Sequence, residues 1–543
     1  IPMWASPTHA GIKAFLMTRA GDVMMLSGMF LIFMYAGTFG FKELLADQTW
    51  AHTMMEQHLL VPAAILLFGG AIGKSAQFPL NEWLLEAMTG PTPVSALIHA
   101  ATMVKAGVFL VARIGPLFFA LAAFDAAAFF EVVAWVGAIT AFLLATQAIV
   151  NPEIKKVLAY STGSQIGYMM MALGIAGLST QFVDGYTAGF FHLMSHAMFK
   201  ASLFMAAGAI LHVVGSRFMT DMGGLRKNMS KTFIFMLLSG LSLASAPLIT
   251  SGFWSKDAIF AALLESGTTT GGALFLIAFI VAIMTAFYTF RMVGMVFFGT
   301  KSKHVQTVEQ SSSTTSQSVS YVSSEPSDDH DLTTSEHDLK YDTKPKVHEV
   351  ALIMWVPFAI LAILTIIIGL IGFIFEEEIH SIMANYLSSS FGIGEGIGIT
   401  NSANNIPQNA DQTTQVINPI AFVSSFVAFG IGAGLGIYFY IMRKKDPEII
   451  SQYPILKQAW FFLYNRWYLN SLLYWGFVKI PLRLYQIIWI YFENIIAQGI
   501  NPALQFSMSY LSKVVKYTQT GVTQTYLFVF AAGIIIVLIM LYL

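Results

Sequence analysis

Two histidines and a lysine share one helix face in the segment FHLMSHAMFK. His192, His196 and Lys200 follow one another at intervals of four residues, so in a helix they lie on one face over about 12 Å of axial rise. Histidine titrates near neutrality, and a lysine withdrawn from water can lose its proton at physiological pH. This column of side chains therefore predicts proton transfer along the helix.

Two other interpretations use the same spacing. Histidines at i and i+4 also suit zinc, but Leu193 follows His192 where a metalloprotease has its catalytic glutamate, and no nearby carboxylate supplies a third ligand. We therefore expect no metal site. Polar side chains also join membrane helices by hydrogen bonds, and this structural interpretation stays open.

Two further lysines lie among residues that weaken helices. Lys74 lies in FGGAIGKSAQFPLNEW and Lys256 in ASAPLITSGFWSKDAIF. Such segments predict discontinuous membrane helices whose freed backbone groups line a hydrated cavity, as in transporters built from inverted repeats. Asp257 can instead form a simple charge pair with Lys256 at a helix end. Arg19 and Asp22, at i and i+3, can pair on one face with a structural or a switching role.

The composition places these residues in a membrane. Of 543 residues, 56% are hydrophobic and 11% are charged, against roughly 25% charged in soluble domains, and the mean hydropathy is +0.66. This argues against a soluble enzyme. The net charge of -1 gives no reason to expect nucleic-acid binding. Because the chain has no cysteine, disulfides, thiolate-bound iron–sulfur clusters and cysteine zinc sites are excluded.

The sequence predicts an all-α polytopic membrane protein with eleven transmembrane helices, because each apolar run reaches the ~20 residues that cross a bilayer. The predicted spans run near 14–37, 60–83, 92–113, 129–150, 155–177, 185–213, 231–260, 272–297, 350–375, 418–441 and 524–543. On this map the loop lysines and arginines gather on one side, and the loop 376–417 has glutamates but no lysine or arginine. We therefore expect residue 1 on the cytoplasmic side and residue 543 outside.

Aspartate, glutamate, lysine, arginine and histidine occur only in the earlier spans, including His99 and Lys105 in the third. The spans 350–375, 418–441 and 524–543 contain none of these five residue types. Each such group costs ~2.5–3.5 kcal/mol at a helix centre. Because a purely structural scaffold would not need several, their default interpretation is an ion or proton path.

The predicted domains follow from these patterns. The region 446–520 mixes aromatic and basic residues in the manner of a membrane interface. As one lateral amphipathic helix its sixty central residues would reach ~90 Å, with Pro481 and Pro502 kinking or breaking it. Short surface helices plus extra spans are the alternative. The predicted domains are a proton-translocating core at 1–300, a disordered cytoplasmic loop at 301–348, lipid-facing scaffold helices at 349–445, the lateral helix at 446–520 and a terminal anchor at 521–543.

The block over roughly residues 12–300 resembles the antiporter-like subunit L of bacterial NADH-quinone oxidoreductase (respiratory complex I), whose mitochondrial equivalent is NADH-ubiquinone oxidoreductase chain 5. The segments that carry the resemblance are TRAGD (18–22), GKSAQFPLNEWLLEAMTGPTPVSALIHAATMVKAG (73–107), IKKVLAYSTGSQIGYM (154–169), FHLMSHAMFKASLF (191–204), MGGLRK (222–227) and SGFWSKDAI (251–259).

The resemblance implies an inverted-repeat antiporter-like fold and a subunit that pumps protons without a redox cofactor or metal. Its expected partners are antiporter-like neighbours along the lateral helix, lipid and protons. Matched by position, the relay residues are Lys74 in the first half-channel, Asp22 as its partner, His99 in the next helix, Lys155 in the linking helix, His192, His196 and Lys200 at the centre, and Lys256 toward the outer side. Lys105, Arg19 and Asp257 are auxiliary candidates.

Three departures from the family keep alternatives open. The chain starts at Ile1, so the family's first helices, one with a glutamate that pairs near the first lysine, are expected upstream. Lys105 is more typical of Mrp-type cation/proton antiporters, or of archaeal relatives of complex I that oxidise a reduced deazaflavin coenzyme. The 301–348 loop is longer than expected. A subunit of an Mrp-type sodium/proton antiporter or of a membrane-bound hydrogenase is therefore the alternative function, and a structural arm subunit without pumping is a second.

Overall fold

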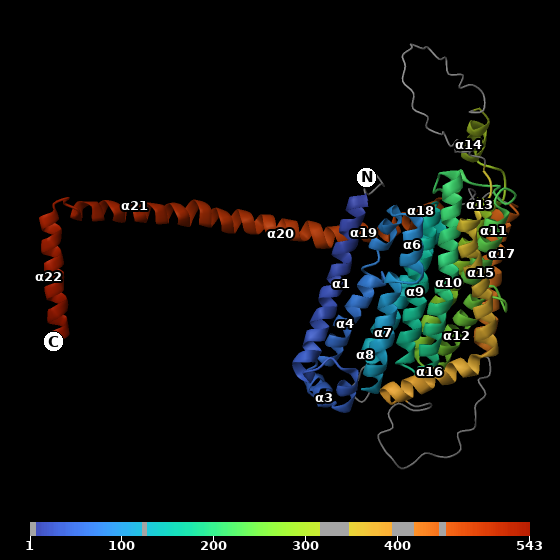
Figure 1. Cartoon of the computed structure of the whole chain (residues 1–543), viewed down its shortest axis with the longest axis horizontal. Coiled ribbons are helices and arrows are strands. Elements are labelled where there is room, and N and C mark those ends of the chain that lie inside the picture. Colours follow the sequence, from blue (N-terminus) through green and yellow to red (C-terminus); the bar gives the residue numbers. More distant parts are fainter. Residues whose placement is uncertain (1–6, 122–126, 315–346, 394–417, 445–451) are drawn as a thin grey trace, which may run out of the picture. The chain divides into compact units, whose positions relative to one another are not determined.

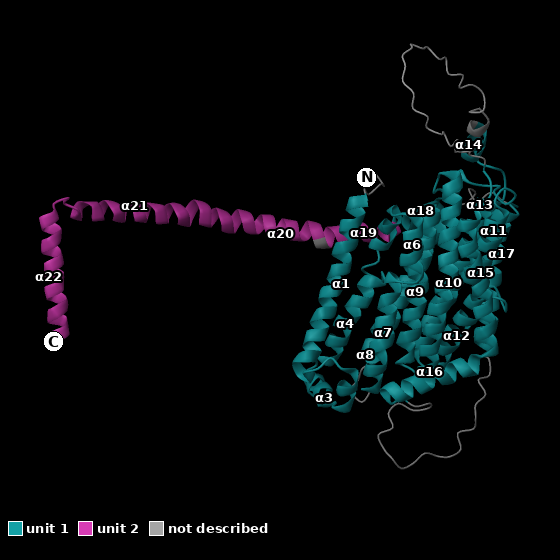
Figure 2. Ribbon diagram, viewed as in Figure 1, with its two compact units in different colours: residues 1–465 teal, residues 466–543 magenta. Residues whose placement is uncertain are grey.

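The computed structural model describes residues 7–121, 127–314, 347–393, 418–444 and 452–543, and within these ranges it is helical, with one isolated bridge between Glu153 and Phe218 and no strand. The all-α prediction is confirmed. The chain divides into two compact units, residues 1–465 and 466–543 (Figure 2).

The first unit is a bundle of long helices that run side by side (Figure 1). Its helices are α1 (Pro7–Ala36), α2 (Phe41–Ala46), α3 (Thr49–Glu56), α4 (Leu60–Lys74), α5 (Trp83–Glu86), α6 (Thr92–Ala100), α7 (Met103–Ala120), α8 (Ala127–Val150), α9 (Ile154–Ala176), α10 (Phe182–Val214), α11 (Ser230–Leu243), α12 (Ser251–Glu265), α13 (Thr269–Phe297), α14 (Lys303–Thr314), α15 (Leu352–Ile374), α16 (Glu376–Phe391), α17 (Pro419–Gly436) and α18 (Pro454–Tyr464).

In the described part of the chain, eight helices are long and apolar enough to cross a membrane, or nine if α3 and α4, bent by 103°, form one span. Each of the eleven predicted spans coincides with at least one helix, but three differ from a simple apolar span. The span at 60–83 ends as a helix at Lys74, and the span at 231–260 is interrupted between α11 and α12. The span at 155–177 is α9, a full-length but more polar helix. The count of eleven therefore stays a prediction.

Helix α9 lies at the centre of the first unit. Nearly all of its residues are buried, including the polar Ser161, Thr162 and Gln165. It packs along α8 and α10. A Cβ on Gly167 would lie 2.4 Å from the Gly137 carbonyl oxygen of α8, so the two backbones touch, as small residues allow in membrane bundles. The central helix of the site is therefore held without lipid contact, and this explains why its polar composition is tolerated.

The two predicted helix breaks are confirmed. Lys74 is the last residue of α4, and the chain returns to helix only at Trp83. Between α11 and α12, Ser245 and Leu248 have φ values of 63° and 67°. Left-handed backbone at residues other than glycine costs ~1–3 kcal/mol each and persists where surrounding packing enforces it. Both lysines therefore lie beside backbone whose polar groups are released from helical pairing.

Helices α14 and α16 lie at the two ends of the first unit (Figure 1). The predicted disordered loop 301–348 begins with a helix, α14, fixed by an ion pair of 2.6 Å between Lys301 and Glu309; residues 315–346 lie outside the described ranges. The amphipathic α16 lies at the end of the bundle opposite α14 (Figure 1). The placement of the two predicted loops on opposite sides of the membrane stays a prediction.

The second unit is a nearly continuous helical run followed by α22 (Thr523–Tyr542). Of the kink or break expected at Pro481 and Pro502, the break is wrong, because the backbone stays helical through both. A π-helical segment precedes each proline, and there the N–H groups of Ile480 and Asn501 bond to carbonyls five residues earlier. This widened turn accommodates a proline ring. The run comprises α19 (Leu469–Tyr474), η7 (Trp475–Lys479), α20 (Ile480–Ile488), η8 (Trp489–Glu493), η9 (Ile495–Ile500) and α21 (Asn501–Thr518). Residues 446–451 of the predicted lateral segment lie outside the described ranges.

Candidate functional site

The first cluster joins α1 to the end of α4. The Lys74 ammonium lies 3.1 Å from the carboxylate of Asp22, which is 9% exposed. The predicted pairing of Arg19 with Asp22 is present at 3.3 Å, although the Arg19 side chain is 59% exposed. Because α4 ends at Lys74, this lysine sits at a helix C-terminus that favours a positive charge. Asp22 is thus shared by two cations, of which Lys74 is the less exposed.

A second ion-pair cluster on the same helix was not foreseen from the sequence. Lys13 of α1 donates to Glu86 at 2.5 Å and lies 4.0 Å from Glu82, and both carboxylates belong to the segment after the α4 break. The side chain of Glu82 is only 1% exposed. The i, i+4 glutamates are visible in the sequence, but their lysine is far away along the chain. Helix α1 therefore presents a cation to α5 and an anion to α4.

Lys105 joins the central column, although the sequence ranks it only as an auxiliary candidate. Its Nζ donates to the Leu193 carbonyl of α10 at 2.5 Å, and its side chain is buried. Leu193 follows His192 directly, so the ammonium lies beside the histidine pair. His99 of α6 is also buried, with its ring 4.9 Å from that of Phe204. Neither His99 nitrogen has a hydrogen-bond partner among the described residues.

The predicted column on α10 is buried along its whole length. The centroids of the His192 and His196 rings are 6.3 Å apart. Lys200 donates to the Leu158 carbonyl at 3.3 Å and to the Ser161 hydroxyl, both on α9. Both His196 nitrogens lack a hydrogen-bond partner within the described ranges. Buried polar nitrogens normally have a hydrogen-bond partner. A chain of water molecules beside the His196 ring would supply the missing partners.

A group of serines continues the column toward the second helix break. His192 Nδ1 lies 2.9 Å from the Ser255 hydroxyl of α12. Ser195 of α10 donates to Ser251 at 2.7 Å, where α12 begins. Lys256 Nζ donates to the carbonyl of Leu243, the last residue of α11, at 2.8 Å. The carbonyl freed by the break thus holds the lysine, as the breaker residues around it predict.

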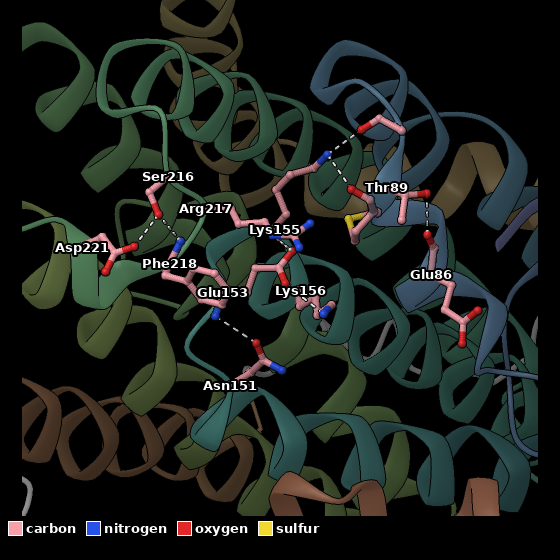
Figure 3. Close-up of polar contacts among 12 residues, drawn as sticks. Glu86, Thr89, Asn151, Glu153, Lys155, Lys156, Ser216, Arg217, Phe218 and Asp221 are labelled. Atoms are coloured by element: carbon pink, nitrogen blue, oxygen red, sulfur yellow. Dashed lines mark hydrogen bonds and ion pairs between the residues drawn. The ribbon is translucent and has the colours of Figure 1, made fainter. Parts of the chain in front are cut away.

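Lys155 and its neighbour Glu153 face different partners at the start of α9 (Figure 3). Lys155 Nζ donates to the carbonyls of Met88 at 3.0 Å and Gly90 at 2.7 Å, in the segment between α5 and α6. Glu153 is 2% exposed and pairs with Lys156 at 2.9 Å, and Arg217 lies 3.8 Å away. The sequence offers one signal for Glu153, a carboxylate directly before a helix N-terminus.

Asp257 belongs to a different environment from Lys256. Its Oδ1 accepts from the Ser425 hydroxyl of α17 at 2.8 Å, and it lines a cavity of about 110 Å³ that α16 also lines. No ion pair joins Lys256 to Asp257 in the described structure, so the interpretation as a simple charge pair is wrong. Within the described ranges no three histidine, aspartate or glutamate side chains are grouped to hold a metal ion.

Comparison with known proteins adds relatives along most of the chain. NADH-quinone oxidoreductase subunit L of Escherichia coli K12 is 44% identical over 301 residues, 55% of this chain and 46% of that protein. NAD(P)H-quinone oxidoreductase chain 5 of Picosynechococcus is 36% identical over 85% of this chain and 63% of its own length. The chloroplastic subunit 5 of Marchantia polymorpha is 36% identical over 96% of this chain and 73% of that protein. The chain thus spans less than two thirds of the first two relatives.

Solved structures show the same fold at low identity. A chain of the Mrp complex from Dietzia sp. DQ12-45-1b superposes with a TM-score of 0.59 and 23% identity, over 99% of this chain and 47% of that one. A chain of an archaeal membrane-bound sulfane sulfur reductase gives a TM-score of 0.52 and 22% identity. The family model of the NADH:quinone oxidoreductase/Mrp antiporter transmembrane region matches residues 3–285. With that match over more than half of its 543 residues, the chain belongs to the NADH:quinone oxidoreductase/Mrp antiporter family of membrane proteins.

Proposed function

We propose that this chain is a proton-translocating membrane-arm subunit of a respiratory NADH-quinone oxidoreductase-type complex. The observation that carries the proposal is the buried row of titratable groups between the two helix breaks: Lys105, His196, Lys200, His192 and Lys256. Relatives that are named as subunits of NADH-quinone oxidoreductases support it. In this proposal the redox reaction takes place in other subunits, and this chain contributes to the enzyme through its proton relay and holds no cofactor.

The row can move protons by electrostatic coupling. Lys105 acts electrostatically on both histidines and on Lys200, and Lys256 acts on His192 and Lys200. At an effective dielectric constant of ~20, two like charges ~8 Å apart repel by about 2 kcal/mol, more than a tenfold change in a proton equilibrium. A proton that arrives at one lysine therefore promotes release from the next. Asp22 and Lys74 form the uptake half, Lys155 and His99 link it to the column, and Lys256 is its outer end.

One observation favours the alternative, a subunit of an Mrp-type sodium/proton antiporter or of a membrane-bound hydrogenase. Lys105, the residue typical of that branch, is fully integrated into the α10 column through Leu193. Copurification from native membranes with a tag at Leu543 distinguishes the two. Partners with iron–sulfur and quinone-site subunits are expected, whereas partners limited to small antiporter subunits would establish the alternative.

The second alternative, a structural arm subunit, is tested by Lys200→Ala with Lys227→Ala as the matched control. Lys200 is buried in the column, and Lys227 is exposed in a loop. In membranes with the complex assembled, we expect Lys200→Ala to lower the number of protons pumped per electron and Lys227→Ala to leave it unchanged. Equal pumping in both variants would support the structural alternative.

The proposed membrane orientation places residue 1 on the cytoplasmic side and residue 543 outside. The lysine- and arginine-rich loops support it, because positive charge concentrates on the cytoplasmic side. In the first unit, α14 and α16 lie at opposite ends (Figure 1), with α16 on the proposed outer side. The proposed partners are antiporter-like neighbours in the membrane arm.

A further inference from the structure

We propose that α16 forms the outer mouth of the proton path, in which Glu376 and His380 exchange protons between Asp257 and the solution. The proposal deepens the proposed function and rests on it. Helix α16 lies across one end of the bundle (Figure 1), and its first turns line the cavity of about 110 Å³ together with residues from α10, α12 and α15. Asp257 lies in that lining, one residue from Lys256.

The cavity is strongly acidic. The carboxylates that line it are Asp184, Asp257, Glu265 and Glu376. Its described lining includes no lysine or arginine, and His380 is the basic side chain there. His380 Nε2 lies 2.6 Å from Asp184 Oδ1, and Glu265 accepts from Asn418 at 2.9 Å. Such a lining raises the local concentration of protons.

The groups of α16 suit proton exchange. Partial burial, together with the neighbouring Glu377, raises the pKa of the Glu376 carboxyl, against the lowering effect of His380. Histidine exchanges protons near neutrality. Glu376 is exposed to solvent and also lines the cavity. The same residue is therefore in contact with both the cavity and the solution.

The cavity has room for water. A water molecule needs ~10–15 Å³ of such space, so about 110 Å³ holds several. The Thr187 hydroxyl on its wall is buried and has no hydrogen-bond partner in the described structure, which is a polar group that water would satisfy. In the proposed step, the O–H bond of protonated Asp257 breaks, a new O–H bond forms on the Glu376 carboxylate through this water, and the proton leaves by His380 or directly to solution.

The far end of α16 is anchored independently of the acidic cavity. Arg113 of α7 donates to the Tyr386 hydroxyl at 2.6 Å and lies over the ring of Phe391. Together with the His380–Asp184 pair, this holds α16 across the bundle end at two points. The mouth is therefore a fixed feature of the fold, and substitutions at Glu376 or His380 leave the Arg113 anchor in place.

The absence of cysteine from the chain allows a direct test of the mouth. Ala261→Cys introduces a thiol on the cavity wall, and Ala172→Cys introduces one on buried α9 as the matched control. Sealed vesicles that contain the whole complex are treated from each side with a charged, membrane-impermeant thiol reagent, and labelling of this chain is followed by mass spectrometry. Because the reagent attacks a hydrated thiolate, we expect Ala261→Cys to react roughly tenfold faster than Ala172→Cys, from the α16 side only.

If Ala261→Cys is labelled from neither side, or only from the opposite side, the cavity is not open to the solution at α16. That result would refute the proposed mouth even if the chain pumps protons. A second measurement tests its use. We expect Glu376→Gln and His380→Gln to lower the number of protons pumped per electron and to shift its dependence on outer pH, while electron transfer and assembly persist. Glu378→Gln, on the same helix but outside the cavity lining, is the control. Unchanged pumping in the first two variants would refute their role, whereas unchanged pumping in Lys200→Ala would refute the proposed function itself.

Discussion

The buried lysines of the site differ in the group that accepts their hydrogen bonds. Lys105, Lys155 and Lys256 donate to backbone carbonyls, and Lys200 donates to a carbonyl and a hydroxyl. These neutral acceptors bond to an amine as well as to an ammonium, so they do not fix the charge. Lys74 alone of these five pairs with a carboxylate, Asp22. We infer that, of the five lysines, Lys74 is the one coupled directly to a neighbouring carboxylate.

At the residue scale, Asp22→Asn is therefore expected to impair proton pumping more than Arg19→Gln. The first substitution leaves Lys74 without its counter-charge, whereas the second removes a cation whose side chain is 59% exposed and therefore well screened. The measurement is the initial rate of redox-driven proton uptake in sealed vesicles, normalised to electron transfer. A larger defect in Arg19→Gln would show that Arg19 is the principal partner of Asp22.

The Lys13–Glu86 pair makes a second residue-scale prediction. The pair joins α1 to the segment after the α4 break, so we expect it to position that segment. Lys13→Glu should reduce assembly of the chain into its complex, because it places a third carboxylate beside Glu82 and Glu86. Adding Glu86→Lys restores one opposite-charge contact, so assembly on native gels should recover in part. No recovery in the double variant would mean that Lys13 acts through other contacts.

At the element scale, the sequence predicts a large part of the bundle but not its cross-links. Apolar runs located the helices that are long and apolar enough to cross a membrane, and Gly, Pro and Ser around Lys74 and Lys256 located both breaks. The pairs Lys13–Glu86 and His380–Asp184 were not predictable, because their members are 73 and 196 residues apart and meet only through the fold. The hydrogen bond of Lys105 was not predictable for the same reason, since its acceptor lies on α10.

Two glycines of α17 test the packing of this helix on α13. A Cβ on Gly432 would lie 2.2 Å from the Ile283 carbonyl oxygen, whereas nothing lies within 4 Å of one on Gly434. Gly432→Ala must push the helices apart and should destabilise the chain by roughly 1–3 kcal/mol, as overpacking does. Gly434→Ala should be neutral or slightly stabilising, because alanine favours helix. Thermal unfolding in detergent measures both, and equal midpoints would contradict the close approach of α17 to α13.

The docking of α16 should depend on pH through Glu376. The raised pKa of this carboxyl means that the docked helix prefers its protonated form. Its contribution to docking is therefore full below the ordinary value of 4.5 and lost as pH rises through the raised value. Hydrogen exchange of α16 amides, corrected for intrinsic rates, should show more protection at pH 5 than at pH 7. The difference should shrink in Glu376→Gln, which keeps the His380–Asp184 pair, and an unchanged difference would exclude Glu376 as its source.

At the scale of the whole molecule, the two units differ in how they are stabilised. Every cluster of buried apolar residues in the described structure lies in the first unit. Among their described side chains, α19, α20, α21 and α22 contain no buried residue, and the second unit exposes large apolar side chains such as Trp489, Phe506 and Phe528. Exposed apolar surface of this extent is typical of groups that contact lipid or partner proteins. The second unit is thus built for contacts outside this chain.

A chain that ends at Asn465 is therefore expected to keep the fold of the first unit and to lose its partners. The truncation removes none of the buried clusters, so detergent-purified truncated and full-length chains should unfold at similar temperatures, and Ala261→Cys and Ala172→Cys should keep their relative labelling rates. Copurification of membrane-arm subunits should fall sharply, because the removed helices carry the exposed apolar surface. A large drop in the unfolding temperature would instead show that the second unit stabilises the bundle, and intact copurification would place the partner contacts on the first unit.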